Sequence, residues 1–334
     1  MGNDYNSNSN TISEYKVESQ IGKGGSSKVF KVKNISSGKF YAKKIFTEEF
    51  YETSISDIQK EIKINKLLSA CDSPYILKYI SSNVEDADLD EDEYESEKYI
   101  ILELASKGEI YNYLKFNETG LNDENCKLII YKILKALQVI HGKGICHRDL
   151  DPKNIFLDGE RYEIKVGDFG LSDFFYDKNG NKIFLKGQLG KSTFMAPEVL
   201  ENRKYDEKID IFSLGVTLFV LRTYQKPFCI AIATYKGKVV DKLYAYIKDK
   251  DEEKYWKELP KYIKSKNNNI IIFDSQFKDL FFKMVAYNPK ERPTIEEILN
   301  HPYIEEVSHA NKDQFKIMEE KLIYELNKRK DLIK

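Results

Sequence analysis

The stretch 147–168 constrains the folding of this 334-residue chain more than any other. It holds two short β-type runs, 155–157 and 164–166, on either side of a turn that opens with Asp158 and Gly159. This dipeptide is favoured where the backbone needs positive φ, so the runs are predicted to pair as an antiparallel hairpin. Such a hairpin brings the two ends of the stretch together.

The open end of the predicted hairpin carries oxygen-bearing side chains. Pairing centred near Arg161 places Asn154, which precedes the first run, beside Asp168, which follows the second. An amide oxygen and a carboxylate suit Mg²⁺ if a phosphate supplies further oxygens. Asp149 lies on the loop before the hairpin, where it is free to act as a base. Each residue alone would be read as a solvated polar group near a turn, but their order favours a catalytic site.

The motifs His147-Arg148-Asp149 with Asn154, and Asp168-Phe169-Gly170, resemble the catalytic core of the eukaryotic protein kinase family, serine/threonine type. The similarity continues in order over roughly residues 15–303. It implies an α+β, bilobal protein-kinase-like fold with a small β-rich N-lobe and a larger α-helical C-lobe, and with Mg²⁺ and ATP bound between them. The expected organisation is a disordered tail at 1–12, a kinase domain at 13–303 with lobes at 13–105 and 106–303, and an amphipathic helical extension at 304–334.

Composition agrees with a soluble intracellular protein. With 41% hydrophobic residues the chain can bury a large core, and a net charge of −1 gives no electrostatic case for binding nucleic acid. The four cysteines lack metal-ligand spacing and suit a reducing compartment. No apolar run is long enough to span a bilayer. We therefore expect a cytoplasmic location, with the nucleus as a possibility.

The N-terminal part of the resemblance concerns the nucleotide. Residues 21–30 read as a glycine-rich turn between β runs, and glycines let backbone amides approach phosphates closely. In the run 40–46, strand alternation puts Lys43 and Lys44 on opposite faces. The resemblance implies that Lys44 contacts the α- and β-phosphates and pairs with Glu61 of a helix predicted at 58–68.

Further nucleotide contacts are implied by the resemblance alone. Leu102 would be the gatekeeper, backbone groups of Glu103 and Ala105 would bind adenine, and Glu109 would reach the ribose. The full implied set is Ile21, Gly22, Gly24, Val29, Ala42, Lys44, Glu61, Leu102, Glu103, Ala105 and Glu109. Asn65 departs from the family, which usually has an apolar residue there, and we expect a less firmly held active state.

The C-terminal part of the resemblance supplies the scaffold. Apolar spacing predicts helices at 110–115 and 126–141. His147 is expected to be a core histidine packed under Phe169 rather than an acid or a ligand. The family pattern implies that Asp210 binds the catalytic-loop backbone. A structural ion pair between Glu198 and Arg292 is implied as well.

Asp151 is the most informative departure from the family. Serine/threonine kinases usually carry a Lys there, which touches the γ-phosphate, and a carboxylate would repel the phosphoryl group. Lys153, or Lys191 in the place of a usual Thr, could compensate. We hypothesise that Asp151 and Lys191 have exchanged charge and pair beside the base. The implied catalytic set is therefore Asp149, Asp151, Lys153 and Lys191, with Asn154 and Asp168 holding Mg²⁺.

The presumed activation segment contains no Ser, Thr or Tyr between residues 177 and 191. Activity is therefore predicted not to depend on phosphorylation at the usual site, here 186–188. Phosphorylatable residues elsewhere in the segment remain as alternatives, namely Ser172, Tyr176, Ser192 and Thr193.

Three other segments leave their roles open. The acidic run 85–97 is either a solvated loop or a docking site for a basic partner. The segment 310–334, with apolar residues at 315, 318, 322 and 326, is either a helix packed on the domain or a docking helix. The lysine-rich region 229–269 is expected to include an insertion of unassigned function.

The resemblance implies an ATP- and Mg²⁺-dependent enzyme that phosphorylates Ser and Thr of protein substrates. A pseudokinase that scaffolds partners is the alternative from another functional class, favoured by Asp151 and Asn65. A tyrosine or dual-specificity kinase is the second alternative. The intact set Lys44, Glu61, Asp149, Asn154 and Asp168 favours the enzyme.

Overall fold

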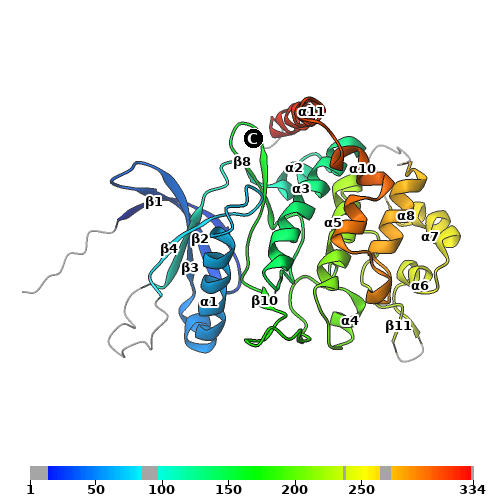
Figure 1. The fold of residues 1–334 in the computed structure, drawn as a ribbon, viewed down its shortest axis with the longest axis horizontal. Helices are drawn as coiled ribbons and strands as arrows, with labels where there is room; N and C mark the ends of the chain where they lie inside the picture. The colour runs from blue at the N-terminus through cyan, green and yellow to red at the C-terminus, as the bar shows by residue number, and fades with distance from the viewer. Residues whose placement is uncertain (1–13, 85–96, 236–237, 264–271, 332–334) are drawn as a thin grey trace, which may run out of the picture. The chain divides into compact units, whose positions relative to one another are not determined.

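A computed structural model describes residues 14–84, 97–235, 238–263 and 272–331. The described residues form two compact units, one drawn from residues 1–62 with 78–104 and the other from residues 63–77 with 105–334. Figure 1 shows the elements of each. The tail expected at 1–12 and residues 85–96 of the acidic run lie outside the described residues, so those expectations stay predictions.

The first unit is an antiparallel sheet with the strand order β1-β2-β3-β5-β4. Its strands are β1 (Tyr15–Lys23), β2 (Ser27–Asn34), β3 (Phe40–Phe46), β4 (Tyr79–Ser82) and β5 (Tyr99–Glu103). Helix α1 (Glu48–Ser69) begins in this unit. Its Ile58 and Ile62 are buried against Phe46 and Ile100 of the sheet. This apolar contact, rather than local propensity, stabilises the helix on the sheet.

The second unit is mostly helical. Its helices are α2 (Ile110–Lys115), α3 (Asp123–Gly142), α4 (Pro197–Leu200), α5 (Lys208–Thr223), α6 (Lys242–Lys248), α7 (Glu252–Glu258), α8 (Ser275–Met284), α9 (Ile295–Leu299), α10 (Pro302–Ser308) and α11 (Lys312–Lys330), with 3₁₀ turns η2 (Leu259–Lys261) and η3 (Pro289–Glu291). Its short strands are β6 (Gly108–Glu109), β7 (Ile145–Cys146), β8 (Ile155–Asp158), β9 (Glu163–Val166), β10 (Asp173–Phe174), β11 (Thr234–Tyr235) and β12 (Lys238–Val239). The antiparallel sheet followed by a mostly helical part confirms the predicted α+β protein-kinase-like fold.

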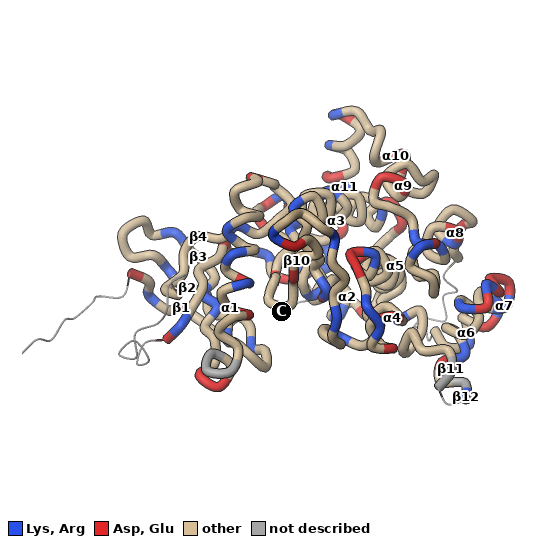
Figure 2. Tube along the Cα trace, turned by 60° about the horizontal axis from the view of Figure 1, so that its bottom comes forward, with Lys and Arg blue, Asp and Glu red and all other residues tan. Residues whose placement is uncertain are grey.

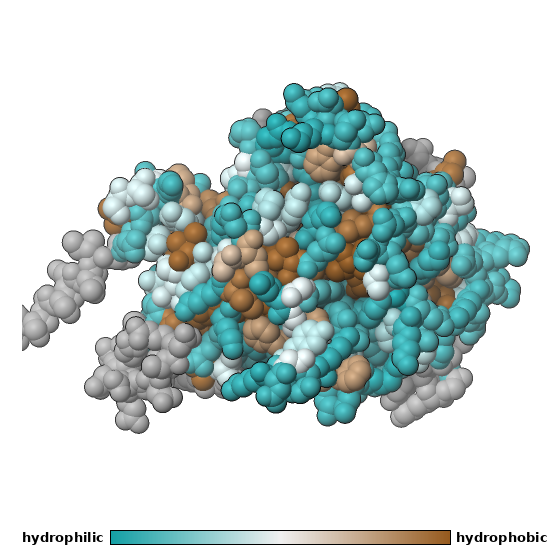
Figure 3. Space-filling view, viewed as in Figure 1, coloured by the Kyte–Doolittle hydropathy of each residue, from teal (hydrophilic) through white to brown (hydrophobic). Residues whose placement is uncertain are grey.

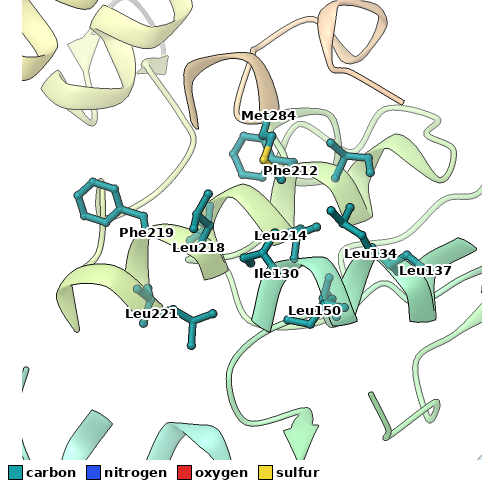
Figure 4. Packing of buried hydrophobic residues seen from close by; sticks show 14 of the residues in the cluster. Ile130, Leu134, Leu137, Leu150, Phe212, Leu214, Leu218, Phe219, Leu221 and Met284 are labelled. Atoms are coloured by element: carbon teal, nitrogen blue, oxygen red, sulfur yellow. The ribbon is translucent and has the colours of Figure 1, made fainter. Parts of the chain in front are cut away.

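Two helices form the centre of the second unit. Helix α3 matches the helix predicted at 126–141 and starts three residues earlier, because the side chain of Asn122 caps it by accepting from the N–H of Asn125. Helix α5 is buried on all sides except at Lys208 and Arg222. Figure 4 shows the leucines of α5 facing those of α3, with Met284 of α8 close by. A Cβ on Gly215 of α5 would lie 2.8 Å from the Cβ of Met284, so only glycine allows this approach.

The lysine-rich region 229–269 contributes β11, β12, α6, α7 and η2 to the second unit. Asp241 organises its start, since its carboxylate accepts from the N–H of Cys229 at 2.8 Å and caps α6 through the N–H of Tyr244 at 2.9 Å. Figure 2 shows acidic residues at the beginning of α7, where negative charge is favourable at a helix N-terminus. The described residues of this region thus pack as part of the unit.

Helix α11 packs on α3 and α2. Leu322 and Leu326 are buried, and Glu319 accepts from Lys132 Nζ at 2.7 Å. Arg329 donates to the carbonyls of Thr119 and Gly120. The outward face of α11 is mostly hydrophilic in Figure 3. Of the two alternatives for residues 310–334, packing on the domain is therefore the one found for this helix.

Within the described residues, none of the helices combines the length and the apolar character needed to cross a membrane.

Candidate active site

The hairpin of β8 and β9 carries the proposed metal ligands at its open end. It pairs Ile155 with Val166, and the N–H of Gly167 donates to the carbonyl of Asn154 at 3.1 Å. Asn154 therefore lies opposite Gly167, one residue before Asp168, rather than opposite Asp168 itself. Asp168 has a φ of +63°, so the chain turns sharply where this carboxylate leaves the hairpin. The predicted hairpin is confirmed, with this small change of register.

Asp210 of α5 holds the backbone of the catalytic loop. Its carboxylate accepts from the N–H groups of His147 and Arg148 at 2.8 and 2.9 Å, and from His141 Nε2 at 2.8 Å. Burial would raise the pKa of Asp210, but the His141 hydrogen bond and these N–H donors hold that pKa below its ordinary value. The predicted scaffold role of Asp210 is confirmed.

His147 is a structural residue of this loop, as predicted. Its side chain is fully buried, and its ring centroid lies 5.2 Å from that of Phe169. Its Nε2 is 3.2 Å from the carbonyl oxygen of Gly167. The histidine thus ties the catalytic loop to the segment that carries Asp168.

Asp149 has one oxygen engaged and one available. Its Oδ2 accepts from Asn154 Nδ2 and from Lys191 Nζ, each at 2.9 Å. Its Oδ1 is buried and accepts no hydrogen bond from any described residue. A buried acceptor without a donor is costly unless a further group arrives. A substrate hydroxyl would supply that donor, which is the geometry a general base needs.

Asp151 pairs with Lys191, as the sequence hypothesis predicts. Asp151 Oδ2 lies 2.5 Å from Lys191 Nζ, and its side chain is only 1% exposed. Its Oδ1 accepts from the N–H of Lys153 at 2.6 Å, which fixes the carboxylate in the loop. Burial works against the charge of Lys191, but the carboxylates of Asp151 and Asp149 hold the pKa of Lys191 above its ordinary value. Lys191 therefore stays charged beside Asp149.

Lys153 is exposed, and its side chain contacts an aromatic ring instead of joining the pair of Asp151 and Lys191. Its Nζ lies 5.2 Å from the ring centroid of Tyr111, a cation–π contact, rather than on a carboxylate. Glu109, which pairs through β6 with β8, is half-buried nearby. Burial raises the pKa of Glu109, and the charge of Lys153 partly opposes that rise.

Arg148 is neutralised from within the chain. Its Nε donates to the carbonyl of Leu171 at 2.5 Å, and its Nη2 lies 3.2 Å from Asp173 Oδ2. The Arg148 side chain is 6% exposed, so its charge needs this counter-charge. Sequence reasoning missed Asp173, although a carboxylate five residues after Asp168 was visible as a charge that could meet the buried arginine.

The alternative phosphorylation sites differ in access. Ser172 is buried with its hydroxyl donating to the carbonyl of His147, and Thr193 is buried with its Oγ1 accepting from Lys226 Nζ at 3.0 Å. Tyr176 and Ser192 are exposed. Only the latter two are open to modification without rearrangement.

Glu198 and Arg292 form the predicted structural ion pair. The guanidinium meets both carboxylate oxygens, at 2.6 and 2.7 Å. Both side chains are almost fully buried. This bidentate pair fixes α4, which follows directly after the segment carrying Lys191.

In the first unit, Lys44 and Glu61 form the predicted pair. Lys44 Nζ lies 2.7 Å from Glu61 Oε1, and both side chains are largely buried. Lys43 lies on the opposite face of β3, with its Nζ 4.1 Å from the ring centroid of Tyr99 and 3.6 Å from Glu97 Oε2. The predicted alternation of the two lysines is therefore confirmed.

The other residues predicted to bind the nucleotide lie on or next to strands of the first unit or at the start of the second. Val29 of β2 pairs with Lys44, and Ala42 pairs with Leu102 of β5. A Cβ on Gly22 would lie 3.4 Å from the Cβ of Val29. Ile21 is exposed at the end of β1, and Gly24 in the turn is exposed as well.

Three predicted residues follow along the same stretch of sequence. The side chain of Glu103 accepts from the N–H of Lys78 at 3.1 Å, and the N–H of Glu103 donates to the carbonyl of Lys78 at 2.8 Å. Ala105 and Glu109 belong to the second unit. The carbonyl of Ala105 accepts from the N–H of Gly108 at 3.1 Å. Their roles toward a nucleotide stay predictions.

The side-chain oxygens at the open end of the hairpin are suitable ligands for Mg²⁺. Asn154 uses both hydrogens of its amide nitrogen on Asp149, so its amide oxygen is left as an acceptor. Asp168 adds a carboxylate. In the part of the chain that the structure describes, no cluster of three or more His, Cys, Asp or Glu could hold a metal. A cation here would therefore take its remaining ligands from phosphates and water, as Mg²⁺ commonly does.

Comparison with known proteins gives one family. A model of the protein kinase domain matches residues 15–304. The serine/threonine-protein kinase dst1 of Dictyostelium discoideum is 29% identical over 291 residues, 87% of this chain and 34% of that protein. A probable myosin light chain kinase of the same organism is 32% identical over 312 residues, 92% of this chain and 87% of that protein. The dual specificity protein kinase shkB, also from that organism, is 30% identical over 300 residues, which are 88% of this chain and 40% of that protein. The chain spans less than half the length of the first and third of these relatives.

Proposed function

Because the chain belongs to the protein kinase family, we propose that it is an active kinase that transfers the γ-phosphoryl group of ATP to Ser and Thr hydroxyls of protein substrates. One observation carries the proposal. Asp149 Oδ1 is a buried acceptor with no donor among the described residues, while Oδ2 is fixed by Asn154 and Lys191. A base held in this way is ready for a hydroxyl proton.

The mechanism follows from the chain's own residues. Asp149 accepts the proton of the substrate hydroxyl at Oδ1 as that oxygen bonds to the γ-phosphorus of ATP, while the bond from this phosphorus to the bridging oxygen breaks and ADP leaves. Lys191 offsets the charge of the phosphoryl group in transfer, and Asp151 keeps that lysine in place. Mg²⁺, for which Asn154 and Asp168 supply oxygens, would neutralise charge on the phosphates when bound.

The first unit is proposed to serve the nucleotide. Lys44, positioned by Glu61 at 2.7 Å, would contact its α- and β-phosphates. The glycine-rich turn would cover the phosphates, and the residues around Val29, Ala42 and Leu102 would enclose the adenine. These roles rest on the resemblance and on the positions of the residues in the sheet.

Specificity for Ser and Thr rests on Pro152 and on the run 192–198, both of which look like serine/threonine kinases. The name of dst1 supports the same class, whereas the name of shkB supports the dual-specificity alternative. The pseudokinase alternative rests on Asp151, a buried carboxylate beside the base where the family usually has a cation. Three expectations stay predictions: a cytoplasmic location, docking by the acidic run 85–97, and independence from phosphorylation at 186–188.

The test is transfer of labelled γ-phosphate from Mg-ATP to peptides with Ser, Thr or Tyr acceptors, with Asp149→Asn as the control. Transfer to Ser and Thr that disappears in the control is the expected result. Transfer to Tyr as well would establish dual specificity. Stabilisation by ATP with no transfer to any acceptor would favour the pseudokinase instead.

A further inference from the structure

Exposed lysines border the proposed base, and the sequence around it is short of acids. Residues 186–196, which lead to α4, contain Lys186 and Lys191 but neither Asp nor Glu. The catalytic loop adds Lys153, whereas its two carboxylates, Asp149 and Asp151, both contact Lys191. Lys191 therefore already has carboxylate partners. Among the described residues, Lys153 and Lys186 form no ion pair.

Short stretches of chain link two of these lysines, Lys226 and Lys153, to the proposed base. Gly190 lies against Asp149, since a Cβ on it would be 3.0 Å from Asp149 Oδ1. Three residues later, Thr193 accepts from Lys226 Nζ at 3.0 Å. On the other side, Lys153 lies in the loop that begins with Asp149, with its Nζ over Tyr111.

Neither lysine has a carboxylate partner. Within the described residues, Lys153 contacts a ring and Lys226 contacts a hydroxyl, and neither forms an ion pair. Both are exposed, so both can meet a bound peptide. Glu109 is half-buried; burial raises its pKa and the charge of Lys153 opposes that rise, but the two side chains form no ion pair. We call Lys153 and Lys226 the basic rim.

We propose that the basic rim selects protein substrates that carry acidic residues close to the Ser or Thr to be phosphorylated. This inference rests on the proposed kinase function. A peptide that presents its hydroxyl to Asp149 must pass these two lysines, so Asp or Glu side chains would gain ion pairs there and Lys or Arg would be repelled. Because the rim is exposed, each contact is expected to change affinity only about two- to five-fold, and salt is expected to screen it.

The test measures binding and transfer separately. Three peptides share one sequence around a central Ser, with flanking residues that are all Glu, all Ala or all Lys. Matched versions with Ala in place of the Ser report binding by fluorescence anisotropy, even if no phosphate is transferred. We expect the acidic peptide to bind about three- to ten-fold more tightly than the neutral one, and the difference to shrink at high salt.

Variants of Lys153 and Lys226 test whether the basic rim causes the preference for the acidic peptide. Lys226→Glu and Lys153→Glu should each reduce the preference for the acidic peptide, and the double variant should favour the basic one. Lys316→Glu, an exposed lysine of α11 away from the loop, makes the same charge change and should leave the preference intact. Equal binding of the three peptides, or a preference that survives the double variant, would overturn the inference. Absence of transfer to every peptide, with preferential binding intact, would overturn the kinase function alone.

Discussion

Replacing Asp151 by Lys tests whether the charge exchange with Lys191 is functional. In the single variant Asp151→Lys, two cations meet at a buried position, and the N–H of Lys153 loses its acceptor at 2.6 Å. In the double variant with Lys191→Thr, one cation remains, placed on the catalytic loop instead of on the segment that follows it. The single variant is therefore expected to be much less active than the double variant.

The structure sets the size of this difference. Two unit charges about 4 Å apart repel by about 4 kcal/mol at an effective dielectric constant near 20. The side chain of Lys191 is 42% exposed, so we discount this repulsion by about half for screening. A difference of about 2 kcal/mol corresponds to roughly 30-fold in rate. The lost acceptor for Lys153 is common to both variants and cancels in the comparison.

The assay is a double-mutant cycle on kcat with Mg-ATP and a Ser peptide, including Lys191→Thr alone. Thermal melting of each variant separates loss of activity from loss of fold. The exposed pair Lys250 and Glu291, 2.9 Å apart, provides the control, since Glu291→Lys with Lys250→Thr should show little coupling. Equal losses in Asp151→Lys and in the double variant would refute the reasoning.

Three further predictions concern the second unit. Leu326→Ala, at a fully buried position of α11, should lower the free energy of unfolding by about 2–5 kcal/mol in urea titrations, and a loss below 1 kcal/mol would contradict the packing described. Glu198→Gln should destabilise by about 3 kcal/mol or more by leaving the Arg292 guanidinium buried without its counter-charge, and an unchanged melting temperature would be the contrary result. Burial raises the pKa of Glu319, but hydrogen bonds and charges from Lys132 and Arg161 outweigh burial and hold the pKa below its ordinary value. The contribution of Glu319 to stability is therefore present above pH 4.5 and is lost as pH falls through the depressed pKa. Limited proteolysis of α11 should therefore increase below about pH 4.5 in the wild type, and Glu319→Gln should remove this part of the pH dependence; an identical pH profile in the variant would argue against it.

Local pattern was enough to predict several parts of the site. Strand alternation put Lys43 and Lys44 on opposite faces, and the Asp158-Gly159 turn predicted the hairpin that carries Asn154. In both cases the information lies within a few residues, because the period of a strand and the φ preference of a turn are local properties. The pairing of Asp151 with Lys191 was accessible too, because two departures from the family pattern carried opposite charges.

Other features were decided only by the tertiary structure. Nothing local to Arg329 predicts that its guanidinium binds the carbonyls of Thr119 and Gly120, and nothing near Lys226 predicts its contact with Thr193.

The sequence by itself therefore determined the fold class through its resemblance to the protein kinase family, and it determined the alternation of Lys43 and Lys44 and the β8–β9 hairpin through local periodicity and short spacings. The position of α11, the counter-charge of Arg148 and the basic rim depend on which distant segments meet. Burial of apolar surface across the whole unit determines which distant segments meet. This burial involves residues from many parts of the chain, so a short stretch of sequence cannot predict it.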